Sequence, residues 1–138
     1  MAELYVVRAE LEGLAAKLAA KHATDEEKRV LQDMVDNDRS LMADPTALAR
    51  ANRRFHKQIH LASHNRYLVQ QLDLVHRSMA LMATTSLAVD GRGEIALAEH
   101  QAIVDAIIAG KAQDAYNCLR DHISVAYVTR LKQELSDD

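Results

Sequence analysis

The sequence is poor in the residues that form turns and disulfides. Its 138 residues include four Gly, one Pro and a single Cys. A β-sandwich or barrel needs many tight turns, so this composition, with its abundant Ala, Leu, Glu, Lys, Arg and Gln, favours helices. The lone Cys118 excludes an internal disulfide and is typical of a reducing compartment. We therefore expect a helical protein that resides in the cytoplasm.

The sequence also lacks a strong positive charge and a long apolar run. Its formal net charge is −3 at pH 7, and its 17 Lys and Arg residues are spread along the chain. A domain that binds nucleic acid by itself usually has a basic stripe, and no such stripe is present. No apolar run approaches the roughly 20 residues that a transmembrane helix needs, and the N-terminus has no signal-peptide pattern. We expect this chain to contact neither DNA nor a membrane by itself.

Aromatic residues make up only 4% of the sequence, whereas apolar residues make up 49%. The core must therefore consist mainly of Leu, Ile, Val, Met and Ala. The length is that of one domain, and it suffices to bury a core of this kind. We find no internal repeat and no interdomain linker, and so expect residues 1–138 to form a single domain.

Local signals divide the chain into helices. Thr24 and Glu27 have the spacing of a capping box, and Asp44-Pro45 is a typical helix start. Residues 89–93, with two Gly, are the clearest loop, and Gly110 is a natural helix end. With the apolar spacing, these signals predict six helices, over about 3–22, 25–42, 45–62, 66–82, 94–110 and 112–135. The fold class is all-α, an antiparallel bundle.

The apolar spacing also predicts which helix faces are buried. In the first helix the residues expected inside are Leu4, Val7, Leu11, Leu14, Ala15 and Leu18. In the second they are Val30, Leu31, Met34, Val35, Leu41 and Met42.

Three of the seven His residues lie on helix faces that should point inward. His100 and His122 lie on the apolar faces of the fifth and sixth predicted helices. His56 lies at the edge of the apolar face of the third, one turn after Asn52. Each could be an ordinary core His with a hydrogen-bonding partner. Three such imidazoles are costly to bury unless one group satisfies them together, and a transition-metal ion would do so.

The other His residues have simpler interpretations. His60 lies further round its helix and should point towards solvent, so it is a weaker ligand candidate. His64 falls in the break after the third helix and His22 at the end of the first, where both suit helix termini. His76 lies near Leu72 and Met79, where the three could line a pocket or simply belong to the core boundary.

Five segments of the sequence resemble one known family. They are 8–20, which is similar to its opening helix; 52–56 (Asn-Arg-Arg-Phe-His); 62–68 (Ala-Ser-His-Asn-Arg-Tyr-Leu); 99–107 (Glu-His-Gln-Ala-Ile-Val-Asp-Ala-Ile); and 115–122, which starts with Ala and ends with His. Together they cover nearly the whole chain in the family's order and spacing. The chain thus resembles the FCD domain, the effector-binding module of the FadR branch of GntR transcriptional regulators.

The resemblance implies a metal site. In metal-containing members an Asp and three His bind a divalent ion, and the matching His residues here are His56, His100 and His122. The Asp position is Asn52, whose amide oxygen can coordinate a metal but carries no charge. Zinc is the expected ion, with nickel and manganese as alternatives. Three imidazoles and one amide would leave the ion its full +2 charge, which should favour an anionic effector.

The resemblance further implies that a small organic acid binds above the metal. Arg8 matches a first-helix Arg that holds the effector's carboxylate, and a guanidinium suits such bidentate recognition. The alternative for Arg8 is a surface ion pair with Glu12 one turn later, worth at most about 0.5 kcal/mol.

We therefore expect a ligand-sensing domain that forms homodimers and regulates DNA binding by a winged helix-turn-helix, which residues 1–138 do not contain. The alternative is a metal-free dimerisation or interaction module, and Asn52 is the feature that favours it. Catalysis has no support, because no Ser or Cys nucleophile is paired with a recognisable base.

Overall fold

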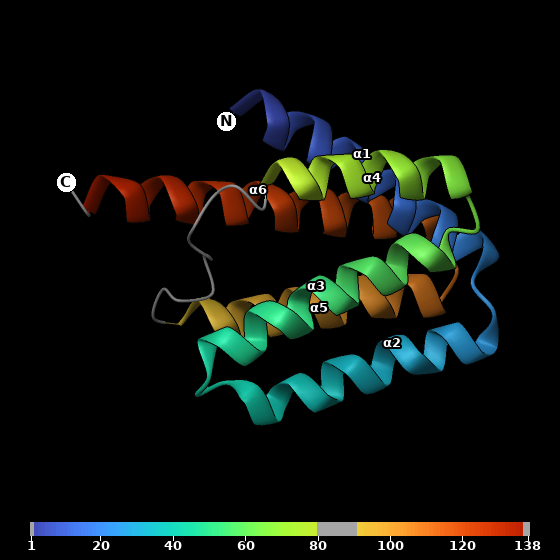
Figure 1. Cartoon of the computed structure of the whole chain (residues 1–138). Helices are drawn as coiled ribbons and strands as arrows, with labels where there is room; N and C mark the ends of the chain where they lie inside the picture. The colour runs from blue at the N-terminus through green and yellow to red at the C-terminus, as the bar shows by residue number, and fades with distance from the viewer. Residues whose placement is uncertain (1, 80–90, 137–138) are drawn as a thin grey trace.

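The computed structural model describes residues 2–79 and 91–136, and these are almost entirely helical (Figure 1). The elements are α1 (Ala2–His22), α2 (Asp25–Asp38), the short 3₁₀ helix η1 (Arg39–Leu41), α3 (Pro45–Ala62), α4 (Arg66–Met79), α5 (Arg92–Ile108) and α6 (Ala112–Ser136). No strand occurs among the described residues, so the predicted all-helical domain with six α-helices is confirmed. Within the same residues no helix is both long and apolar enough to cross a bilayer.

The predicted helix starts are present. The Glu27 backbone N–H donates to Thr24 Oγ1 (3.1 Å), and the Thr24 N–H donates to Glu27 Oε1 (2.8 Å), which completes the capping box. Asp44 caps α3 by accepting from the Ala47 N–H (3.1 Å), and Pro45 occupies the first turn. Gly110 follows α5 with φ +71°, a left-handed conformation that glycine adopts without strain.

Two helix boundaries differ from the prediction. The second helix ends at Asp38, and the chain then tightens into η1, so Leu41 and Met42 lie outside α2. The fifth helix begins at Arg92 instead of residue 94, directly after Gly91, which has φ +78°. Residues 1, 80–90 and 137–138 lie outside the described residues; among them are Met82, the first two residues of the predicted loop and the end of the acidic tail.

The prediction for the buried face of α1 was right only in part: Ala15 is buried, and Leu4, Leu11 and Leu18 are partly buried. Val7 and Leu14 are exposed, and the helix buries mainly small residues, among them Gly13, together with Glu12. The reason is close packing: α1 lies against α6, and a Cβ on Gly13 would come within 2.8 Å of the Tyr116 ring. Larger side chains would hold the helices apart, so the aliphatic residues lie at the edges of the contact. Val30 of α2 is likewise 40% exposed, contrary to expectation.

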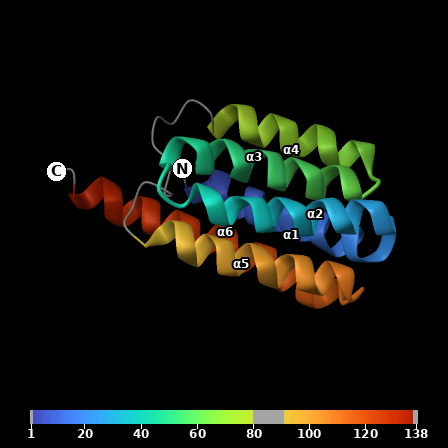
Figure 2. The ribbon, with the colours of Figure 1, turned by 90° about the horizontal axis from the view of Figure 1, so that it is seen from below.

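Four other helices pack against α1, which leaves part of its surface exposed. These helices are α3, α4, α5 and α6, and α2 lies over α3 and α5 on another side of the bundle (Figures 1 and 2). The largest fully buried side chains of the core are mostly aliphatic. They include Leu31, Phe55, Ile59, Leu72, Ile103, Ile107, Leu119 and Ile123. The helices α3, α4, α5 and α6, together with α1, supply the side chains described below.

Gly13→Ala should destabilise the domain by about 1–3 kcal/mol through overpacking against Tyr116. This loss opposes the gain of about 1 kcal/mol that Ala normally brings to a helix interior. Chemical denaturation measures the difference. Gly93→Ala is the matched control, because its Cβ would meet the flexible ends of Leu48, at 3.2 Å, and Met42, at 3.6 Å. Equal stability changes in the two variants would contradict the packing argument.

Candidate metal centre

The structure brings His56 of α3, His100 of α5 and His122 of α6 to one place inside the bundle. Their exposed fractions are 1%, 3% and 4%. One ring nitrogen from each lies within 4.8 Å of the others, and the Nε2 atoms of His100 and His122 are 3.3 Å apart. Three side chains from distant parts of the sequence thus form one buried cluster, which we call the three-His cluster.

The neighbouring Phe55 helps to orient this cluster. Its ring stacks on His100 with centroids 4.3 Å apart and an angle of 25° between the planes. The His56 ring lies edge-on to His100, with ring centroids 5.6 Å apart, and it stacks with His122, with centroids 5.4 Å apart. Phe55 is fully buried, so it fixes the position of the His100 ring and leaves little freedom for it to rotate away.

A buried carboxylate holds His56. His56 Nδ1 donates to Glu12 Oε2 over 2.5 Å, and the Glu12 side chain has no solvent exposure. This bond leaves His56 Nε2 directed into the protein, where it is buried and has no hydrogen-bonding partner in the described part of the chain. Histidines that bind metals commonly donate their other ring N–H to a carboxylate in this way.

His122 is held by a second carboxylate. Its Nδ1 donates to Glu99 Oε1 (3.0 Å), and the same oxygen accepts from Arg92 Nη1 (2.6 Å). Arg92 is buried and is the first residue of α5, two positions before the predicted start of that helix. Glu99, itself held by Arg92, therefore orients the His122 ring so that its Nε2 faces His100. Glu12 acts in the same way on His56, because it engages Nδ1 and leaves Nε2 free.

The electrostatic environment keeps His56 and His100 neutral. Burial lowers the pKa of His56 from 6.5 to about 4, although Glu12 opposes this shift. Burial, with the nearby His122 and His56, holds the pKa of His100 well below its usual value. For Glu12, burial alone would raise the pKa, but its interactions with His56, His60 and His76 outweigh burial and lower it well below 4.5. Neutral imidazole is the form that binds metals.

The geometry of the three-His cluster fits a metal ion. Zn–N bonds of about 2.0–2.1 Å in a tetrahedral site place neighbouring ligand nitrogens about 3.3–3.4 Å apart. The 3.3 Å between His100 Nε2 and His122 Nε2 agrees with this spacing. A hydrogen bond between those two rings would also fit, but it would leave His56 Nε2 buried without a partner. The cluster could therefore hold a metal, and an ion would satisfy all three rings.

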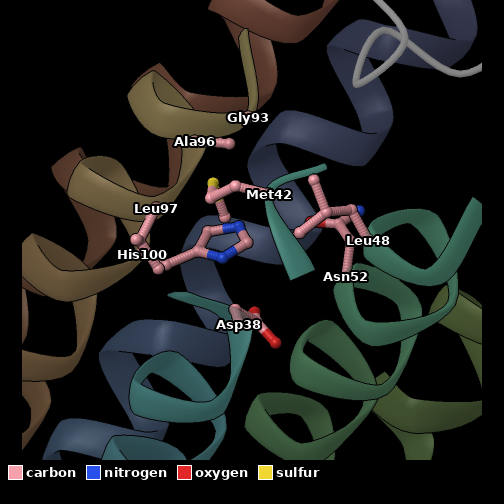
Figure 3. Close-up of a pocket in the computed structure, with 8 residues that line it drawn as sticks. All are labelled: Asp38, Met42, Leu48, Asn52, Gly93, Ala96, Leu97 and His100. Carbon is pink, nitrogen blue, oxygen red and sulfur yellow. The ribbon is translucent and has the colours of Figure 1, made fainter. Parts of the chain in front are cut away.

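Asn52 lies one turn before His56 and faces a small pocket that His100 also lines (Figure 3). The cavity volume is about 10 Å³, close to the minimum for one water molecule. An organic acid would need more room than this. The role of Asn52 as a metal ligand remains a prediction.

The same pocket contains Asp38, a buried residue that the sequence did not single out. Burial raises the pKa of Asp38, and the charge of Arg54 partly opposes the increase.

A second group of side chains lies beside the three-His cluster. His60 is only 1% exposed and contacts Glu12 Oε1 through Nε2, so the expectation that it points to solvent was wrong. The helices α1 and α4 cover this side of α3. His76 of α4 is half-buried, with Nε2 3.4 Å from the same Glu12 oxygen. Glu12, His60 and His76 offer three ligand atoms within 4.8 Å.

Arg8 is half-buried one turn before Glu12. The alternative of an Arg8–Glu12 ion pair does not occur, because Glu12 contacts His residues instead. The Arg8 Nε is buried and has no hydrogen-bonding partner among residues 2–79 and 91–136. Its charge contributes to the lowered pKa of His56, so the guanidinium lies near the three-His cluster.

Leu72 and Met79 were candidates for lining an effector pocket. Leu72 is fully buried in the core, Met79 packs against the core, and neither lines the pocket in Figure 3. Their role, with that of His76, in lining an effector pocket stays a prediction. His64 lies in the turn between α3 and α4 with φ +55°, and its Nε2 is 2.7 Å from Oε1 of Glu27 in the first turn of α2. Sequence reasoning missed Glu12 as a buried residue. The available signal was its spacing with other buried residues of α1, namely Tyr5, Ala9, Ala16 and Ala19.

Comparison with known families decides the class of the protein. A family model described as the FCD domain matches residues 3–125. The chain belongs to the FCD domain family. The resemblance noted in the sequence is thereby confirmed, and the chain is an effector domain of a GntR-type transcriptional regulator, not an enzyme.

Two bacterial relatives match this FCD domain in sequence. It is 30% identical over 131 residues to the "Putative L-lactate dehydrogenase operon regulatory protein" of Escherichia coli, with 92% of this chain and 50% of that protein covered. It is 29% identical over 108 residues to the "Uncharacterized HTH-type transcriptional regulator YdhC" of Bacillus subtilis, covering 76% of this chain and 48% of that protein. The chain spans about half the length of these curated relatives.

Two solved structures share its fold. E. coli McbR/YncC superposes with a TM-score of 0.83 at 18% identity, over 96% of this chain and 64% of that one. Streptococcus agalactiae GntR superposes with a TM-score of 0.74 at 24% identity, over 93% and 57%. These likenesses support the fold of the FCD domain.

The metal-free domain should lose stability between about pH 6.5 and pH 4. In this range the unfolded state binds a proton at His56 that the folded state excludes, so acid favours unfolding. The lowered pKa of His56 corresponds to a loss of about 3 kcal/mol in the free energy of unfolding between these two pH values. Glu12, whose pKa is lowered in the folded state, adds a further loss at lower pH. Urea unfolding in the presence of a chelator at several pH values measures this dependence.

His56→Gln removes this titration while keeping a polar group near Glu12, so its stability should depend less on pH. His22→Gln, at an exposed position at the end of α1, is the control and should behave as the wild type. An unchanged pH dependence in His56→Gln would show that His56 is not the group responsible.

Proposed function

We propose that this FCD domain binds one divalent metal ion through His56, His100 and His122, with Asn52 as a fourth ligand. The observation that carries the proposal is the buried, unpartnered Nε2 of His56 beside the paired Nε2 atoms of His100 and His122. Zinc suits three neutral imidazoles, and nickel or manganese are alternatives. Glu12 and Glu99 would act from behind the ligands by fixing their orientation.

The ion would create a positively charged centre for an anionic effector. None of the four proposed ligands carries a charge, so the ion would keep its +2 charge in a buried site. Arg8 adds a guanidinium whose Nε has no partner in the described structure. A carboxylate between the ion and Arg8 would satisfy both. The E. coli relative is named for an operon whose enzyme acts on lactate, a small carboxylate of the class that we propose here.

The effector would regulate DNA binding through a separate winged helix-turn-helix domain in the cytoplasm. Its binding can shift an equilibrium only if two states of the protein differ in affinity for it. We further propose that the domain forms homodimers. In support, α1 and α6 expose aliphatic side chains, namely Val6, Val7, Val125, Val128 and Leu131, which a monomer would leave in water.

The rival is a metal-free dimerisation module. Asn52 favours it, because a neutral amide attracts a cation less strongly than the Asp found at this position in metal-containing members. Both functions use the same fold, so metal content separates them.

Purified, untagged protein should contain about one zinc, nickel or manganese ion per chain at the three-His cluster, and His100→Ala should lose it. Asn52→Asp should bind the same metal more tightly, because a carboxylate replaces an amide. Elemental analysis and a chelator competition measure these quantities. His22→Ala, an exposed His remote from the cluster, is the control. A domain that takes up no metal at this cluster, even after reconstitution, would support the metal-free module instead.

Arg8→Gln should weaken the binding of a small carboxylate at least about tenfold while leaving the metal content unchanged. Removing a charge-assisted hydrogen bond typically costs about 1.5–3 kcal/mol, which corresponds to this factor or more. Thermal shift of the zinc-loaded domain with L-lactate, malate and succinate provides the measurement. If an acid stabilises Arg8→Gln as strongly as the wild type, then Arg8 does not bind the effector.

A further inference from the structure

The three-His cluster does not account for a second group of potential ligands. Glu12 of α1, His60 of α3 and His76 of α4 offer one oxygen and two nitrogens within 4.8 Å of one another. Glu12 and His60 are fully buried, whereas the His76 side chain is 30% exposed. The group is therefore buried at Glu12 and His60, whereas the His76 ring, apart from its buried Nε2, is partly exposed.

The two oxygens of Glu12 face different neighbours. Oε2 accepts from His56 Nδ1 over 2.5 Å. Oε1 faces His60 Nε2 in close contact and His76 Nε2 at 3.4 Å. One carboxylate oxygen and two imidazole nitrogens thus converge, on the side of Glu12 that is not engaged with the three-His cluster.

Hydrogen bonding explains only part of this convergence. If His60 donates to Glu12, its Nε2 is satisfied, but His60 Nδ1 and His76 Nε2 are buried and make no hydrogen bond within the described structure. His76 Nε2 is 3.4 Å from the oxygen, which is long for a hydrogen bond but matches the spacing of neighbouring ligands around a tetrahedral ion.

We propose that Glu12, His60 and His76 form a second site, for a divalent transition-metal ion such as zinc. Two His and one Glu are a ligand set that zinc accepts, with water in the remaining position. Unlike the three-His cluster, this set includes a charged ligand, so the cation would neutralise a carboxylate that the fold buries completely. The exposed edge of His76 provides an entry path.

The second site does not require a metal at the first, but the two would be linked. Glu12 would bind the second ion through Oε1 and support His56 through Oε2. An ion on Oε1 would withdraw charge from the carboxylate, and His56 would then be a weaker ligand for the first ion. Because such coupling is reciprocal, each ion would lower the affinity for the other.

Zinc stoichiometry in matched variants tests the second site. The untagged chain is loaded with zinc, dialysed and analysed for bound metal, and cobalt absorption spectra give an independent measure. We expect two ions in the wild type, one in His76→Ala, one in His100→Ala and none in the double variant. His22→Ala should retain two. Circular dichroism establishes that each variant folds, and Glu12→Gln, which keeps the side chain's shape, should also lose the second ion.

The outcomes separate this proposal from the proposed function. One ion in both the wild type and His76→Ala, with none in His100→Ala, would overturn the second site and leave the three-His site intact. One ion in the wild type and His100→Ala, with none in His76→Ala, would support the second site and overturn the first. A wild type that binds no zinc would overturn both.

Discussion

The buried Glu12 carboxylate is the constraint on which the site depends. A carboxylate without solvent is costly unless other groups compensate its charge, and here His56 and His60 hydrogen-bond to it. Glu12 therefore ties α1 to α3 in the centre of the bundle. Its contact with His56 Nδ1 also decides which nitrogen of that ring faces inward. Removing the carboxylate would free His56 to turn, and the three-His cluster would lose its alignment.

The same principle operates at His122. Glu99, which also accepts from Arg92, holds His122 through its Nδ1. His56 and His122 thus both present Nε2 to the cluster, and Phe55 fixes the ring of His100. The carboxylates come from α1 and α5, and the ligands come from α3, α5 and α6. Four helices must therefore pack correctly before the three nitrogens meet. This dependence provides a physical route by which occupancy of the site could influence helix packing.

The fold and the three His residues could be predicted because local rules govern them. Helix caps at Thr24 and Asp44 depend on neighbouring residues, and the apolar spacing around His100 and His122 indicates an inward direction. The buried face of α1 could not be predicted in this way, because Gly13 and the surrounding Ala residues are selected by the approach of α6. Glu12 was misjudged for a related reason: a charged residue reads as exposed until its partners, His56 and His60, are placed around it.

The most direct test of the central claim is long-range ¹H–¹⁵N NMR of the His side chains in the zinc-loaded domain. The account predicts that His56 and His122 carry their proton on Nδ1 and bind zinc through Nε2, since Glu12 and Glu99 accept from Nδ1. The Nε2 signals of both should then shift when zinc is added to metal-free protein. Unshifted signals, or a proton on Nε2 of either ring with zinc bound, would contradict the account.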